Sequence, residues 1–100
     1  MAQTTLFVNS VAYEIPPDGT AYFVLGPANF KGAVTVTAHP SVGILEPPQY
    51  MEVIQMAVRT VGLEHPGEPM HMLDIVFRNN SHGSYGTTIT NFDIFTSVVA

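Results

Sequence analysis

The sequence predicts one all-β domain spanning residues 1–100, folded as an antiparallel β-sandwich, immunoglobulin-like or jelly-roll-like, with about six to eight strands. Three observations favour this fold. A chain of 100 residues is long enough for one hydrophobic core and too short for two ordinary domains. Segments rich in Val, Ile, Phe, Tyr and Thr alternate between apolar and polar residues, as half-buried strands do. Turn signals containing Pro, Gly or Asn separate these segments at short, fairly even intervals.

The first two strands are predicted at Thr5–Ile15 and Ala21–Leu25, where β-branched and aromatic residues are frequent. Pro16-Pro17-Asp18-Gly19 lies between them and predicts a tight turn. Pro17 presets φ for the second position of the turn, and Asp and Gly accept its strained third and fourth positions. We therefore interpret this part of the chain as a β-hairpin.

The clearest strands are Ala33–Ala38, the segment around Leu73–Phe77 and a long final strand within Tyr85–Val99. In each of them apolar side chains recur at every second position, which places them on one face. The residues predicted to face the core are Val34, Val36, Ala38, Leu73, Ile75, Phe77, Phe92, Ile94 and Val98.

Tyr50–Val61 admits two interpretations. Its apolar residues recur at spacings of three and four, with prolines before the segment and Gly62 after it, as in an amphipathic helix. However, its β-branched residues lower helix propensity, and the loop after it resembles a hairpin connection to the strand at Met70–Arg78. We favour a strand. A helix at this position would make the fold α+β.

The charge balance excludes several classes of partner. Only Lys31, Arg59 and Arg78 oppose eight acidic residues, which gives a formal net charge of −5. Three scattered cations cannot form the basic stripe that contacts nucleic-acid phosphates or anionic lipid. No apolar run reaches transmembrane length, so we expect no membrane insertion.

The surface is predicted to be unusually neutral, because charged residues make up 11% of the chain against about 25% in an average globular protein. Such a chain either presents a neutral polar surface or covers apolar surface by association. The expected partner is therefore a second copy of the chain, as a homo-oligomer, or another protein. The N-terminus lacks the pattern of a signal peptide. We expect a soluble protein, and the composition only slightly favours a secreted or surface-associated location over the cytoplasm.

One segment carries side chains that bind metal ions. Residues 64–72 hold two histidines, two glutamates and two methionines. If this segment ends a hairpin, His65 and His71 could approach each other, with Glu68 or Glu64 as a third ligand. The spacing matches no recognised zinc pattern. The alternative is a polar loop with exposed histidines and buried methionines.

A second segment carries side chains suited to a small ligand. Asn79, Asn80, His82 and Tyr85 could hydrogen-bond to a carbohydrate and stack on its ring. The alternative is that the Asn and Gly residues of this loop only form its turn.

The sequence predicts no catalysis and no cofactor. It contains no cysteine, no Gly-x-Ser-x-Gly elbow and no glycine-rich phosphate loop. The function we expect is that of a non-enzymatic interaction or structural module that self-associates. The alternatives are lectin-like carbohydrate binding through Asn79–Tyr85 and metal binding through His65 and His71.

Overall fold

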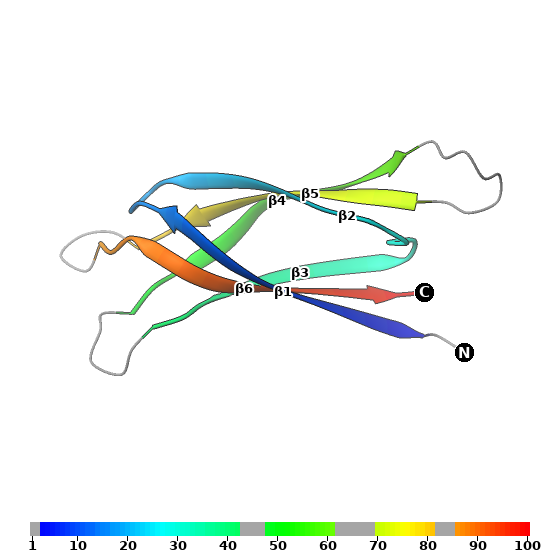
Figure 1. Ribbon diagram of the computed structural model, residues 1–100, viewed down its shortest axis with the longest axis horizontal. Coiled ribbons are helices and arrows are strands. Elements are labelled where there is room, and N and C mark those ends of the chain that lie inside the picture. Colours follow the sequence, from blue (N-terminus) through cyan, green and yellow to red (C-terminus); the bar gives the residue numbers. More distant parts are fainter. Residues whose placement is uncertain (1–2, 43–47, 62–69, 82–85) are drawn as a thin grey trace.

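The computed structural model describes residues 3–42, 48–61, 70–81 and 86–100. These residues form six strands and no helix, arranged as two layers of antiparallel sheet (Figure 1). The strands are β1 (Thr4–Ile15), β2 (Thr20–Ala28), β3 (Ala33–Pro40), β4 (Met51–Val61), β5 (Met70–Asn79) and β6 (Ile89–Val99). The predicted all-β, sandwich-like fold is confirmed. The described residues include no apolar helix of membrane-spanning length.

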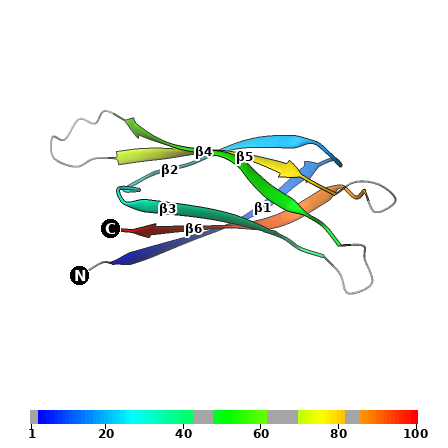
Figure 2. The same cartoon turned by 180° about the vertical axis from the view of Figure 1, so that it is seen from behind.

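Each layer is a sheet of three strands. The first sheet has the order β1-β6-β3 and the second sheet the order β2-β5-β4, with every pairing antiparallel. The view from behind shows the same two layers, with the N- and C-termini side by side on the first sheet (Figure 2). Four of the six strands are therefore sheet edges.

The core lies between the two central strands, β5 and β6. Alternate residues of both strands are buried because each central strand is flanked by two others and faces the opposite sheet. The rings of Phe23, Phe77 and Phe92 meet at this layer with centroids 5.6–5.8 Å apart. The buried apolar residues are Ile15, Ala21, Phe30, Leu73, Ile75, Phe77, Ile89, Phe92, Ile94 and Val98.

The predicted hairpin between the first two strands is wrong, although its turn is correct. Gly19 N–H donates to Pro16 O at 2.8 Å, and Asp18 has the left-handed φ of 62° that the third turn position requires. However, β1 pairs with β6 and β2 with β5, so the turn carries the chain from one sheet to the other. Tight two-residue hairpins need a positive φ at the second turn position, which Pro17 cannot adopt.

The ambiguous segment is a strand, as predicted, and it pairs with the strand that follows it. β4 and β5 form an antiparallel hairpin in which Val53 lies opposite Phe77 and Met56 opposite Ile75. A register shift between Val53 and Gln55 makes Ile54 an extra residue in β4. This β-bulge changes the phase of the alternation, which explains why the sequence pattern of a strand is imperfect here.

Candidate interaction surfaces

The outer face of the first sheet is apolar and almost uncharged. Leu6 and Val8 of β1 expose 60% and 54% of their surface, and Val8 lies opposite Phe95 of β6. The ring of Phe95 contacts the imidazole of His39 edge to face, at a centroid distance of 4.9 Å. Across Thr4–Ala12, β3 and β6, the sequence contains one carboxylate, Asp93, and no Lys or Arg. This face is therefore an apolar patch with a rim of Thr and Ser side chains.

The outer face of the second sheet differs because it carries ion pairs. The Tyr22 hydroxyl donates to Asp74 Oδ1 at 2.6 Å, and Arg59 Nε donates to Asp74 Oδ2 at 3.1 Å. These hydrogen bonds from Tyr22 and Arg59 hold the pKa of the Asp74 carboxyl below its usual range. The hydrogen bond to Asp74 raises the pKa of Tyr22 and, likewise, that of Arg59. On the same sheet Arg78 lies 3.5 Å from Asp18.

A second exposed apolar region lies along β4. Ile54, Met56 and Val58 are all more than one third exposed, although Met56 and Val58 lie opposite buried residues of β5. The Met56 and Val58 side chains are therefore on the inner face of the second sheet, and their exposure shows that the first sheet does not fully cover them. The bulge at Ile54 interrupts this series of exposed apolar side chains, and the charged Arg59 follows it in the sequence.

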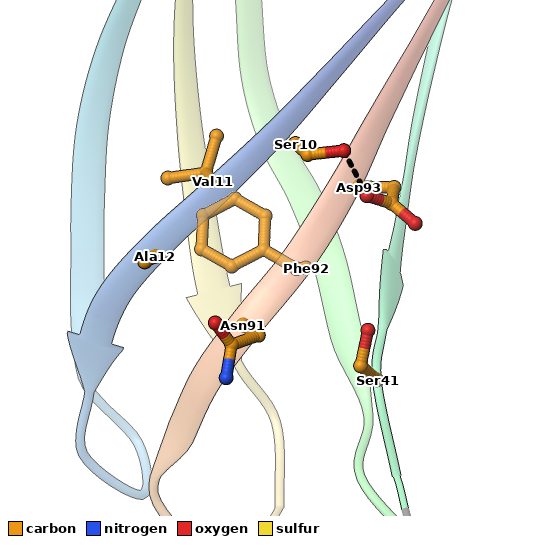
Figure 3. A pocket seen from close by; sticks show the side chains of 7 residues that line it. All are labelled: Ser10, Val11, Ala12, Ser41, Asn91, Phe92 and Asp93. Atoms are coloured by element: carbon orange, nitrogen blue, oxygen red, sulfur yellow. Dashed lines mark hydrogen bonds between the residues drawn. The ribbon is translucent and has the colours of Figure 1, made fainter.

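A groove of about 450 Å³, lined by both polar and apolar residues, lies where β1, β6 and the end of β3 meet (Figure 3). Ser10 Oγ donates to Asp93 Oδ1 across it at 2.7 Å, and Asn91 and Ser41 complete its polar lining. Asn91 is exposed, and its amide donates to the neighbouring Thr90 hydroxyl. The carboxylate of Asp93 therefore already accepts a hydrogen bond from within the protein, from the Ser10 hydroxyl.

A second groove, of about 400 Å³, lies between the end of β3 and the start of β4. It is lined by His39, Gln49, Tyr50, Glu52 and Asn80 together with three less polar residues. The Tyr50 side chain is 57% exposed there. An exposed aromatic ring beside amide and carboxylate groups is the composition of a site that binds sugars or short polar segments.

The structure separates the residues predicted to bind a ligand. Asn80 lines the second groove, whereas Asn79 is fully buried and presents no surface to a ligand. The Asn79 amide donates to the carbonyl oxygens of Ile15 and Thr87 at 2.8 and 2.7 Å and accepts from Ser81 N–H at 3.0 Å. Its role is structural. His82 and Tyr85 lie outside the described residues.

Of the residues predicted to bind a metal ion, the structure describes only His71. Its ring is 7% exposed, and its Nδ1 accepts a hydrogen bond from Phe30 N–H at 3.1 Å, which leaves only Nε2 for a metal ion. His65 and Glu68 lie outside the described residues. Among the residues that the structure does describe, no three His, Asp or Glu side chains come together as metal ligands. Metal binding through His65 and His71 stays a prediction.

Sequence reasoning did not identify Leu6 and Val8 as an exposed patch. The signal that could have found them is the run Leu6-Phe7-Val8, in which apolar residues occupy both faces of one strand. Phe7 faces the core and contacts the Phe30 ring at 5.3 Å, so its two neighbours point outward.

Comparison of this chain with protein-family models, curated proteins and solved structures finds no match to any of them.

Proposed function

We propose that this chain is a non-enzymatic structural module that associates with copies of itself through the first sheet. One observation carries this proposal: a nearly charge-free outer face with Leu6 and Val8 more than half exposed. Large apolar side chains that cluster on a surface, rather than occur singly, are typical of protein–protein contact. Two copies that each carry a net charge of −5 repel over most of their surfaces. The first sheet, along its β1 edge and the adjoining outer face, is where they can meet at the lowest electrostatic cost.

We expect the protein to form dimers or larger oligomers in a concentration-dependent manner, and Val8→Lys to weaken this association. A Lys at position 8 places an ammonium group in the centre of the patch, where association would bring it beside apolar side chains of the second copy with no opposite charge nearby. The expected loss is about tenfold or more in the association constant, equivalent to about 1.4 kcal/mol. Sedimentation velocity over a wide concentration range measures it.

Val24→Lys is the matched control. Val24 is 39% exposed and also lies on an edge strand, but on the outer face of the second sheet beside Asp74. Val24→Lys changes the net charge by the same amount as Val8→Lys but lies outside the patch. We therefore expect the association constant of the Val24→Lys variant to stay within about twofold of that of the unsubstituted protein. A strict monomer at all concentrations would refute self-association. An equal effect of both substitutions would show that charge, not the patch, controls it.

A second candidate function is the binding of a small carbohydrate in the second groove. It rests on the exposed Tyr50 ring, which lies in the same groove as Glu52 and the predicted ligand residue Asn80. A sugar ring stacks its apolar C–H face on an aromatic side chain, and its hydroxyls bond to amides and carboxylates. This site is close to the one predicted from Asn79–Tyr85 but is not the same.

If this second function is correct, a glycan array should give reproducible hits that Tyr50→Ala weakens by about tenfold or more in calorimetry. Tyr13→Ala serves as the control because Tyr13 is exposed to a similar degree, 52%, but does not line the groove. The absence of any hit, or equal losses for both substitutions, would remove carbohydrate binding as a function of this groove.

A further inference from the structure

Along its outer edge, the main chain of β1 has a row of hydrogen-bonding groups that no described strand pairs with, called the free row below. Gln3 and Ala100 exchange two main-chain hydrogen bonds, at 3.0 and 2.9 Å, and so form a hydrogen-bonded pair of the antiparallel ladder. Such pairs alternate along a ladder, so Thr5, Phe7, Asn9 and Val11 also bond to β6. The N–H and C=O groups of the residues between them point away from β6. These residues are Thr4, Leu6, Val8, Ser10 and Ala12.

The bond between Ser41 and Asn91 independently supports this assignment. Ser41 N–H donates to Asn91 O at 3.0 Å, so the main-chain groups of Asn91 point toward β3. Because these directions alternate, the odd-numbered residues of β6 bond to β3 and the even-numbered residues bond to β1. The free row ends at Ala12, because the register between β1 and β6 shifts between Ala12 and Ile15. It therefore covers nine residues, Thr4–Ala12, with Val8 at the centre.

The other three edge strands carry the features by which proteins protect sheet edges from pairing. β2 contains Pro27, which has no N–H, and a register shift between Leu25 and Ala28. β4 has the bulge at Ile54 and charged side chains at Glu52 and Arg59. β3 is the shortest of the six strands, and it ends in Pro40. β1 has such features only at its end, where the register shifts between Ala12 and Ile15 and Glu14 lies. Between Thr4 and Ala12 it has no proline, no charged residue and no register shift.

A two-fold axis can pair the free row of one copy with the free row of a second copy. In an antiparallel pair centred on Val8, Val8 lies opposite Val8 of the second copy, Leu6 opposite Ser10 and Thr4 opposite Ala12. Every free N–H and C=O of the row then has a partner, for up to about ten main-chain hydrogen bonds. The exposed Leu6 and Val8 side chains of both copies would form one apolar stripe on the outer face.

Electrostatics also favours a second copy in this position. The facing segments carry no charge, so no like charges are opposed within them. Asp93 lies opposite Ser10, one strand in from the edge, so the two Asp93 carboxylates of a pair are separated by three strand spacings, about 14 Å, and by a further offset of about 14 Å along the strands. That distance exceeds the Debye length of about 8 Å at physiological ionic strength.

We infer that β1 pairs antiparallel with β1 of a second copy, in the register centred on Val8, and joins the two first sheets into one continuous sheet. This inference rests on the self-association proposed above and places the contact at the β1 edge of the first sheet, where Leu6 and Val8 of both copies lie side by side on the shared outer face. The second sheets of the two copies stay separate, because Pro27 and the register shift prevent β2 from pairing in the same way.

The chain has no cysteine, so single cysteines report contacts without background. Opposite residues of a hydrogen-bonded pair have Cα atoms about 5.5 Å apart, within the range that a disulfide spans. Val8→Cys alone should therefore give covalent dimers on mild oxidation. Leu6→Cys alone and Ser10→Cys alone should not, because the identical positions are offset by about 14 Å along the strands. A mixture of Leu6→Cys with Ser10→Cys should cross-link. Val24→Cys, on β2, is the control for random collision.

Non-reducing electrophoresis and sedimentation of the same samples separate the possible failures. Dimers in sedimentation without a Val8→Cys cross-link would overturn the β1 pairing and leave self-association standing. Cross-linking of Leu6→Cys alone would overturn the register centred on Val8. Monomers throughout, with no cross-link, would overturn self-association and this inference together.

Discussion

Phe77→Ala is expected to lower the free energy of unfolding by about 3–5 kcal/mol. Phe77 has no exposed surface, and its ring packs against Phe23 and Phe92 with centroids 5.8 Å away in both cases. Its removal leaves a cavity between two sheets whose spacing is fixed by strands on both sides. Because a domain of this size is stable by only about 5–15 kcal/mol, this loss removes a large fraction of the free energy of unfolding. Denaturation in urea, followed by far-ultraviolet circular dichroism, measures the change.

Phe95→Ala is the matched control on the outer face. Phe95 is partly exposed and contacts His39, and its removal opens no closed cavity. We expect a loss of about 1 kcal/mol or less. A loss for Phe95→Ala equal to that of Phe77→Ala would contradict the location of the core between β5 and β6.

The central strands could be predicted from the sequence because each is covered on one face and flanked on both edges. Under those conditions burial alternates strictly, and Leu73, Ile75 and Phe77 show the alternation directly. The same phase extends to His71 and Asn79, which are buried as the continuation of that pattern requires. Their residue types point elsewhere, since Asn79 is typical of turns and His71, although within the predicted Met70–Arg78 strand, is typical of metal sites. Periodicity was the better guide than residue type at these two positions.

The assignment of strands to sheets could not be predicted in the same way. The Pro16–Gly19 turn has the same local chemistry whether the next strand pairs with β1 or enters the opposite sheet. Pairing depends on contacts distant in sequence, such as β1 with β6, and no local pattern encodes them. The free edge of β1 is a property of sheet order, so the candidate interface emerged only from the structure.

Asn79→Ala should also destabilise the fold by about 3–5 kcal/mol, although it removes no apolar surface. The substitution leaves the carbonyl oxygens of Ile15 and Thr87 and the N–H of Ser81 without their partner. Each buried polar group left unpaired costs about 1–3 kcal/mol. The same denaturation measurement applies.

Two further variants make this prediction specific. Asn79→Asp retains the acceptor for Ser81 but directs a carboxylate oxygen at two carbonyl oxygens, so its loss at neutral pH should match or exceed that of Asn79→Ala. Its loss should shrink as the pH falls, because a protonated carboxyl can donate one bond. Asn91→Ala removes an exposed amide and should cost less than about 0.5 kcal/mol. A loss below about 1 kcal/mol for Asn79→Ala would show that these bonds are replaced by water.

The expected size of the effect follows from where Asn79 lies. Its side chain ties the end of β1 to the segment that leads into β6, and its main chain bonds to Asp18 N–H and Gly19 O in the turn that crosses between the sheets. Ser81, which donates to the Asn79 side chain, in turn accepts from Tyr50 N–H through its hydroxyl at 3.0 Å. Asn79, together with Ser81, therefore connects the turn between the sheets, the residue before β4 and the approach to β6. Because β1 and β2 are not paired with each other, this network, rather than a hairpin ladder, holds the two sheets together at this end of the molecule.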